Sequence, residues 1–327
     1  MRYYNISITG GGGQPVVYTS HPNGLYAPPD PYALDFECDI LEFPFATPAG
    51  NSFIRLWGIS LQTIANAQQL NGQSITVSGG MGKGLPLANP QQAGILAAGN
   101  IWQAFGNWQG TAMTLDIYAI PGLAPAPNKA AAAGNPDLPA NIVLNWKANT
   151  TLSDALSPCL QTAYPGYKVV VNINPGLVVG NDQPAYYQSL TQLSQFLNQK
   201  TKAIIGGSYP GVSIKCIGTT ITAYDNYNAS QQAAKEIAFT DLVGQVTWIA
   251  PQTVMATCVM RGDLEVGMMV KMPPGQIAIQ AQSFSQFRQS SAIQGTFVIT
   301  KLRHIGNFRQ PQGTAWVTTV EAVTSVT

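Results

Sequence analysis

The chain has 327 residues, of which only 9% are charged, and its formal net charge is +1. A charge so close to zero excludes a global electrostatic attraction to nucleic acid or to a membrane surface. The sequence also lacks an apolar run of the ~18 residues that a membrane-spanning helix needs. Its first residues, MRYYNISITGGGG, do not contain the apolar segment of a signal peptide, so we expect none.

The four cysteines lie far apart in the sequence and form no C-x-x-C pair: Cys38, Cys159, Cys216 and Cys258. This spacing predicts reduced, buried thiols and folding in a reducing cytoplasm, and argues against a secreted disulfide scaffold. With so few charges, the surface must consist largely of Asn, Gln, Ser and Thr. Such a surface is typical of a protein that works inside an assembly.

The first 120 residues predict short β-strands. In YALDFECDILEF the apolar residues Leu34, Phe36, Cys38 and Ile40 alternate with acids, which indicates a half-buried strand. Further strands are predicted in SFIRLWGI, QSITVSGG, AGNIWQAFG and AMTLDIYAIP. A short helix is predicted in SLQTIANAQQLNG, with Leu61, Ile64 and Ala65 on its apolar face and its end near Gly72. Many short strands separated by turns predict a sandwich or a barrel.

The next part of the chain changes character. PGLAPAPNKAAAAGNPDLPA (121–140) predicts an extended linker at a domain boundary. TTLSDALSPCLQTAYPG and YYQSLTQLSQFLNQKTKAI then have apolar residues at helical spacing, although Pro158 is expected to kink or shorten the first helix. YKVVVNIN predicts a strand, and GVSIKCIGTTITAYD predicts a hairpin that turns near Gly218. This pattern indicates a small α+β domain.

The last hundred residues return to strand patterns, in KEIAFTDLVGQVTWI, TVMATCVMRGDL, GMMVKMPP, GTFVITKLRHIG and TAWVTTVEAV. They also contain a repeat. GNWQGTAMTLDIYA (106–119) is similar to GNFRQPQGTAWVTTVEA (306–322), with three extra residues before the second Gly-Thr-Ala. The repeat predicts two related β domains around the α+β domain, and two unrelated hairpins of similar composition are the alternative.

The glycine-rich stretch GGMGKG (79–84) does not have the pattern of a phosphate-binding loop. A P-loop needs a glycine where Val77 stands and a hydroxyl residue where Gly84 stands. The G-x-G-x-x-G spacing also fails, here and in GGGG (10–13), and the LPLANP that follows cannot begin a helix. We therefore expect a flexible turn that binds no nucleotide and instead reaches a neighbouring subunit or another component of its assembly.

No catalytic, cofactor-binding or metal-binding residue is predicted, and the chain is not expected to be an enzyme. His21 lies in a turn, and His304 alternates with Leu302 in a strand. GGSYPG is not a nucleophile elbow because Pro210 takes the place of its last glycine, and no Cys/His spacing suits zinc.

Three charged motifs have alternative interpretations. The acids at positions 30, 35, 37, 39 and 42 form either a solvated or interface face, or a surface that pairs head-to-tail with segment 43–115 of another subunit, which contains no acid. Arg261-Gly262-Asp263 matches an adhesion tripeptide only by coincidence, since it lies in a turn between strands. The nearby bases are scattered surface charge or contact an acidic partner or DNA: Lys271, Arg288, Lys301, Arg303 and Arg309.

Together these motifs resemble the baseplate hub proteins of contractile-tailed bacteriophages. The likeness lies in three stretches that span most of the chain: IRLWGISLQTIANAQQLNGQSITVSGG through AMTLDIYAIP, LNWKANTTLSDALSPCLQTAYPG, and IAFTDLVGQVTWIAPQTVMATCVMRGDLEVGMMVKMPP with the last hairpin. The resemblance implies a mainly β chain with two tail-tube-like antiparallel β-barrel domains (1–122 and 229–327), a linker (123–140) and a small α+β domain (141–228). No segment resembles the lytic enzyme fused to some hubs.

The resemblance also implies partners and a location. Such a hub is a homotrimer with pseudo-sixfold symmetry that joins the tail tube protein to the central spike protein and contacts other baseplate proteins. Its channel passes the tape-measure protein and DNA, with no cofactor. The expected location is the virion tail baseplate, after assembly in the host cytoplasm. The alternative is a β-rich tail protein that binds a receptor or glycan through tryptophans on a concave face: Trp57, Trp102, Trp108 and Trp316.

Overall fold

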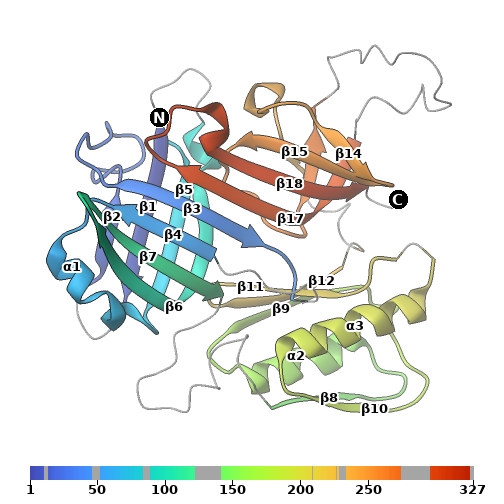
Figure 1. The fold of residues 1–327 in the computed structure, drawn as a ribbon. Coiled ribbons are helices and arrows are strands. Elements are labelled where there is room, and N and C mark those ends of the chain that lie inside the picture. The colour runs from blue at the N-terminus through green and yellow to red at the C-terminus, as the bar shows by residue number, and fades with distance from the viewer. Residues whose placement is uncertain are drawn as a thin grey trace, which may run out of the picture.

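The computed structural model describes residues 1–10, 14–45, 52–83, 89–121, 141–207, 209–225, 227, 233–273 and 295–324. Its buried apolar residues form three large clusters. We name the parts around them the N-terminal lobe (residues 1–121), the α+β lobe (141–225) and the C-terminal lobe (233–324). In Figure 1 the two β lobes lie side by side and the α+β lobe lies below them.

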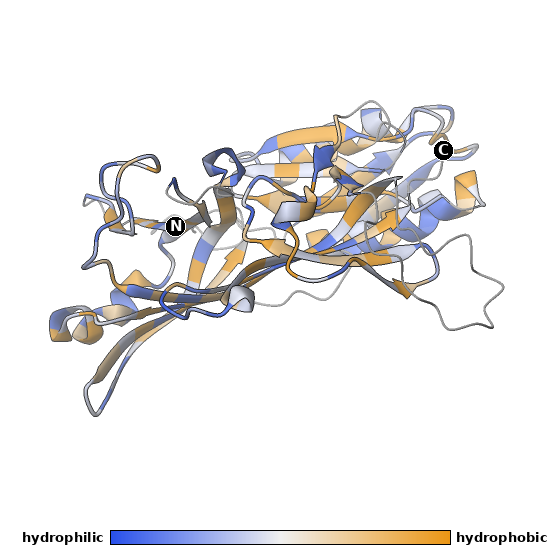
Figure 2. Ribbon diagram, turned by 90° about the horizontal axis from the view of Figure 1, so that it is seen from above, coloured by the Kyte–Doolittle hydropathy of each residue, from blue (hydrophilic) through white to orange (hydrophobic). Residues whose placement is uncertain are grey.

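The N-terminal lobe is an antiparallel sheet with the order β3-β4-β7-β6-β5-β1-β2. Its strands are β1 (Arg2–Thr9), β2 (Val16–Thr19), β3 (Asp35–Glu42), β4 (Ser52–Trp57), β5 (Ser74–Met81), β6 (Gly94–Gln109) and β7 (Ala112–Pro121). Between β4 and β5 lie helix α1 (Leu61–Ala65) and the 3-10 helix η1 (Ala67–Leu70), and η2 (Pro90–Gln92) precedes β6. Apolar and polar residues alternate along the strands (Figure 2), so one face of the sheet forms the core.

This sheet curls over its own core. Strands β1 and β3 are five positions apart in the hydrogen-bonded order. Nevertheless, the Tyr4 ring on β1 lies 4.9 Å from the Phe36 ring on β3, and the Tyr4 hydroxyl donates a hydrogen bond to the Leu34 carbonyl. Side chains therefore close the gap between β1 and β3, and no ladder of backbone hydrogen bonds joins these two strands in the described residues.

The C-terminal lobe repeats the strand order of the N-terminal lobe. Its strands are β13 (Lys235–Glu236), β14 (Thr247–Ala250), β15 (Thr253–Val259), β16 (Met269–Met272), β17 (Gly295–Asn307) and β18 (Trp316–Thr324), with 3-10 helices η5 (Phe239–Asp241) and η6 (Gly313–Ala315). The order β14-β15-β18-β17-β16 matches β3-β4-β7-β6-β5 strand for strand. The agreement supports the internal repeat seen in the sequence.

The two β lobes share one sheet. Residues Leu302–Asn307 of β17 pair with Glu37–Glu42 of β3, which joins the lobes into a 13-stranded sheet. The chain is therefore mainly β, as predicted, and its β part is a large antiparallel sheet. The two separate closed barrels that we predicted are not seen in the described residues, because β3 pairs outside its own lobe and β1 does not pair with it.

The α+β lobe packs two helices against two small sheets. Strands β8 (Ile142–Trp146) and β10 (Gln183–Tyr187) form one sheet, and β11 (Ser213–Ile217), β12 (Thr220–Tyr224) and β9 (Lys168–Asn172) form the other. Helix α2 (Leu152–Ala163) begins at Thr151, whose hydroxyl accepts a hydrogen bond from the Asp154 N–H, and it continues through Pro158 without ending there. Helix α3 (Leu190–Ile205) buries Leu190, Leu193 and Leu197, as its sequence pattern predicted.

Two local predictions were wrong. Gly79, Gly80 and Met81 do not form a turn but belong to β5, where they pair with the start of β1. Leu61 was expected on the buried face of its helix, yet it is 52% exposed. The predicted linker falls almost entirely outside the described residues, and the proposed domain boundaries stay predictions.

Candidate assembly site

Among the described residues, no group of three or more His, Cys, Asp or Glu side chains could hold a metal ion, and no helix there is long and apolar enough to cross a membrane. The charged side chains that form ion pairs lie where the lobes meet and along the outer face of the sheet.

The outer face of the sheet carries charges that are paired within the chain. The guanidinium of Arg55 on β4 donates two hydrogen bonds to the Asp116 carboxylate on β7, at 2.6 and 2.7 Å, and lies 4.0 Å from Glu37 on β3. Arg303 on β17 binds Asp39 on β3 in the same two-pronged way, at 2.8 and 2.6 Å. Glu37 and Asp39 of β3 thus have basic partners in their own chain, so a head-to-tail contact is not needed to neutralise these two acids.

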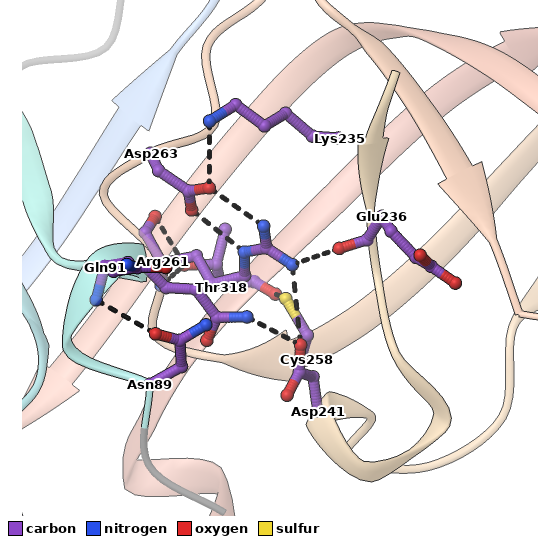
Figure 3. Close-up of polar contacts among 10 residues, drawn as sticks. Asn89, Gln91, Lys235, Glu236, Asp241, Cys258, Arg261, Asp263 and Thr318 are labelled. Atoms are coloured by element: carbon purple, nitrogen blue, oxygen red, sulfur yellow. Dashed lines mark hydrogen bonds and ion pairs between the residues drawn. The ribbon is translucent and has the colours of Figure 1, made fainter. Parts of the chain in front are cut away.

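A second charged group lies buried between the two β lobes (Figure 3). The Arg261 side chain is 3% exposed, binds Asp263 with two hydrogen bonds of 2.9 Å and donates to the Glu236 carbonyl at 2.6 Å. Asp241 lies 3.5 Å from it and also accepts a hydrogen bond from Gln92 of the N-terminal lobe. The Arg-Gly-Asp tripeptide is therefore a structural contact between lobes, not a sequence displayed to an external receptor.

At this contact the backbone around Gly262 packs directly against the backbone around Gly94. The Gly262 N–H donates to the Gln92 carbonyl at 2.9 Å. A Cβ atom placed on Gly94 would lie 2.2 Å from the Gly262 oxygen, and one placed on Gly262 would lie 2.4 Å from the Gly94 oxygen. Both positions require glycine because no side chain fits between the two backbones.

A third group of charges joins all three lobes. Glu42, at the end of β3, accepts a hydrogen bond from the Val266 N–H at 3.1 Å. Lys215 on β11 binds Glu265 at 2.7 Å and the Val266 carbonyl at 2.8 Å. Burial raises the pKa of Glu42 to about 7, although the charge of Lys215 opposes this rise. Next to this group is a cavity of about 230 Å³ with mostly apolar walls.

The 13-stranded sheet leaves several stretches of strand edge without a partner in the described residues, and three of them bear on assembly. Strand β14 pairs only with β15, and β2 pairs only with β1. Both carry exposed apolar side chains: Val16, Val17, Trp248 and Ile249. The ladder between β6 and β5 stops at Asn100. The rest of β6, residues 101–109, is named here the far half of β6 and pairs with β7 as its only strand partner among the described residues. Unpaired edges with exposed apolar residues are sites where another chain adds.

The glycan-binding alternative requires four tryptophans exposed on one concave face, and they are not all exposed. Trp316 is 3% exposed and packs in the N-terminal core, where its ring N–H donates to the Gly80 carbonyl. Trp57 lies beside Arg55 on the outer face, with the guanidinium 5.5 Å from its ring. Trp102 and Trp108 are both exposed on β6. This distribution does not form a carbohydrate platform.

Both histidines and all four cysteines are buried. His304 Nδ1 lies 2.9 Å from the Thr318 hydroxyl, its Nε2 has no hydrogen-bond partner in the described residues, and burial lowers its pKa to about 4. Burial also raises the pKa of the thiols of Cys38, Cys159 and Cys258, which keeps them protonated and unreactive.

Sequence reasoning did not find the Arg261 and Glu42 groups. The only available signal was charge within otherwise apolar strand patterns, which does not name a partner. The free edge of β14 had a weak signal, because Trp248 and Ile249 are adjacent apolar residues on a strand without clean alternation.

No protein-family model matches the sequence, and no curated protein matches it. Solved structures do match the fold. The 43 kDa tail protein of prophage MuSo2 from Shewanella oneidensis has a TM-score of 0.52 at 10% identity, over 99% of this chain and 98% of that one. A tail protein from Neisseria meningitidis MC58 gives 0.49 at 12% identity, over 98% of this chain and 96% of that one.

A structure titled "PdpA-VgrG Complex, Lidless" gives a TM-score of 0.46 at 9% identity, over 98% of this chain and 64% of that chain. Of the three, the Shewanella structure is the one similar enough to compare folds. Over nearly its whole length, the chain has the fold of that prophage tail protein.

Proposed function

We propose that the chain is a structural component of a contractile phage tail and forms the trimeric hub of its baseplate. The observation that carries the proposal is the duplicated β lobe: one chain holds two sheets of the same strand order side by side. Three such chains would present six similar lobes around one axis. The whole-chain fold likeness to a prophage tail protein supports the same role.

In this role the hub adapts symmetry. Six β lobes would face the sixfold tail tube protein, while features that occur once per chain would face the threefold central spike protein. The α+β lobe occurs once per chain, so we assign to it the contacts that hold the trimer or that bind other baseplate proteins. The proposal places the protein in the virion tail after assembly in the host cytoplasm and assigns it no catalytic step.

The charge arrangement suits a wall along which DNA and the tape-measure protein pass. On the outer face, Arg55 and Arg303 are each bound by a carboxylate through two hydrogen bonds. A guanidinium held in this way is less available to a phosphate, so the face would not retain a passing polyanion. The assignment of this outer face to the channel wall is part of the proposal.

Mass photometry tests the proposal most directly. We expect three chains of 34.8 kDa, about 104 kDa together, and binding of this trimer to rings of the cognate tail tube protein. A stable monomer that binds neither tube nor spike protein would contradict the hub. The receptor- or glycan-binding alternative has no specific support, because one of its four candidate tryptophans, Trp316, is buried in the core.

A further inference from the structure

The two β lobes agree in detail at the strands that correspond. In β6, the Ile101 N–H and C=O bond to Gln73 and Gly72, and a bulge follows at once. In β17, the Ile299 N–H and C=O bond to Met268 and Gly267, and a bulge follows there too. Ile101 therefore corresponds to Ile299, and the residues beyond the two bulges correspond one by one.

The same comparison aligns the first strands of the two repeats. One row across the sheet contains the side chains Gln103, Tyr118, Phe53 and Asp39, and the equivalent row contains Lys301, Glu321, Met255 and Thr247. Asp39 on β3 thus corresponds to Thr247 on β14. Strand β14 is the counterpart of β3.

These two counterparts differ in what they bind. Strand β3 pairs on one side with β4 and on the other with the far half of β17, with Asp39 opposite Ile305. Strand β14 pairs with β15 alone, and the far half of β6 has no strand on its β5 side in the described residues. A joint of this kind therefore forms once within the chain, between β3 and β17. Its two counterparts are left open: β14 at one end of the sheet, and the part of β6 beyond Asn100 in the N-terminal lobe (Figure 1).

We propose that β14 of one copy adds to the far half of β6 in a second copy, in the register of the β3–β17 joint. This inference rests on the proposed function, since repeated joints of this kind would close a ring of alternating lobes. Asn107 corresponds to Ile305 and Gly106 to His304. The register thus places Thr247 opposite Asn107 and Trp248 opposite Gly106 of the neighbouring copy.

The chemistry of the two edges agrees with this joint. Trp248 and Ile249 are 44% and 47% exposed, and the surface beside Gly106 is apolar, with Ile64 against Gly106 and Leu61 52% exposed on α1. Burying these side chains together would add a hydrophobic term to the backbone hydrogen bonds. The Asn71 side chain already accepts the Ala104 N–H, so we expect the ladder to end before Ala104.

Charge favours contact between unlike lobes. Residues 1–122 contain six acids and three bases, and residues 229–327 contain seven bases and five acids. A C-terminal lobe that meets the N-terminal lobe of another copy therefore brings opposite net charges together, whereas contact between two like lobes would not. The joint is heterologous, as a closed ring requires.

Disulfide trapping tests the joint and its register. The double variant Thr247→Cys with Asn107→Cys is oxidised as the purified full chain, and its products are separated without reductant. Strands β14 and β6 lie in different lobes, seven strands apart in the hydrogen-bonded order, and a bond within one chain would leave a monomeric product. The four native cysteines are buried and do not compete. We expect covalent two-chain and three-chain species.

Three controls make the result specific. Asp39→Cys with Ile305→Cys reproduces the joint inside one chain and should give a monomeric disulfide. Thr247→Cys with Phe105→Cys is two residues out of register and should cross-link at least about tenfold less, because diagonal neighbours lie ~7–8 Å apart. Neither Thr247→Cys nor Asn107→Cys alone should cross-link.

The possible failures have distinct meanings. If the chain is a trimer by mass photometry but the double variant does not cross-link, this joint is wrong and the hub proposal stands. If Thr247→Cys alone gives covalent dimers, the contact joins like lobes and the joint is overturned. A monomer under all conditions overturns both the joint and the hub.

Discussion

Arg261 is the charged residue at the contact between the β lobes whose replacement should lower stability most. Its guanidinium is buried against Asp263 and Asp241. Arg261→Met would leave the buried Asp241 carboxylate without a cation and Asp263 with only Lys235, and breaking a buried pair in this way typically costs ~3–5 kcal/mol. We expect a clear fall in the unfolding midpoint in urea. Lys235→Met is the control: its side chain is 46% exposed and lies 3.4 Å from Asp263, so its loss should cost under ~1 kcal/mol.

At the same contact, the absence of a side chain at Gly94 and Gly262 allows the two backbones to approach. A methyl group on either glycine would overlap the carbonyl oxygen of the other. Gly94→Ala should therefore force the lobes apart locally and cost ~1–3 kcal/mol or more, as overpacking does. Gly313→Ala, where no atom lies within 4 Å of the added Cβ, is the matched control. Equal thermal unfolding midpoints for the two variants would contradict this close approach.

At the scale of elements, strand β11 is held against the β lobes by groups that respond to pH. The raised pKa of Glu42 means that its protonated form is favoured while the contact is closed. The contact is therefore strongest at low pH, and it weakens as pH rises from the ordinary glutamate value of 4.5 to about 7. The charged or titratable groups that face Glu42 are Lys215 on β11, Glu265 beside it and Tyr224 on β12.

We therefore expect the amides of β11 to exchange with solvent faster at pH 8 than at pH 5.5, after correction for intrinsic rates. Glu42→Gln should remove most of this difference, and Glu265→Gln should keep the transition but move it to lower pH, because a neighbouring negative charge is gone. His304 acts in the opposite direction and at lower pH, between its ordinary value and about 4. Its effect should be the same in all three proteins. A pH response that survives in Glu42→Gln would assign it to another group.

The elements also show what the sequence could and could not predict. Strand β3 and the hairpin at Gly218 were predicted correctly, because alternation and a turn glycine are local signals. Strands β8 and β10 were not predicted: β8 has only five residues, and the Pro184 in β10 argues against a strand. The sequence repeat aligned Gly106 with Gly306, two residues away from the structural alignment, because the tip of the second hairpin is longer.

The candidate site was harder to predict than the fold. Alternation along β3 correctly separated its acids from its apolar residues, but it does not say which strand lies beside it. The partner β17 is more than 250 residues away in the sequence, and that pairing decides both where the lobes join and which edges stay free. Long-range pairing of this kind depends on the whole curled sheet, not on any local pattern.

For the whole molecule, the shared sheet predicts that the two β lobes unfold together. The β3–β17 ladder and the Arg261 group cross the boundary between them, whereas the α+β lobe has a core of its own. In native-state hydrogen exchange with increasing urea, amides of β5 and β18 should converge on one free energy of unfolding. Amides of α2 and α3 should follow a separate, lower one.

Arg261→Met provides the test of this coupling. It should lower the free energy of unfolding reported by β5 and by β18 by the same amount and leave α2 and α3 unchanged. If β18 responds while β5 does not, the lobes are thermodynamically independent despite their common sheet.

The paired bulges of β6 and β17 have a consequence for how the chain arose. Two strands that share a bulge after the same isoleucine, with the same hydrogen bonds on either side of it, are best explained by duplication of one ancestral gene segment. The two copies then differ in their connections: the N-terminal copy has helix α1 between β4 and β5, and the C-terminal copy has the longer hairpin tip between β17 and β18. Shared bulges of this kind can therefore indicate a common origin even where the side chains of the two copies are no longer similar.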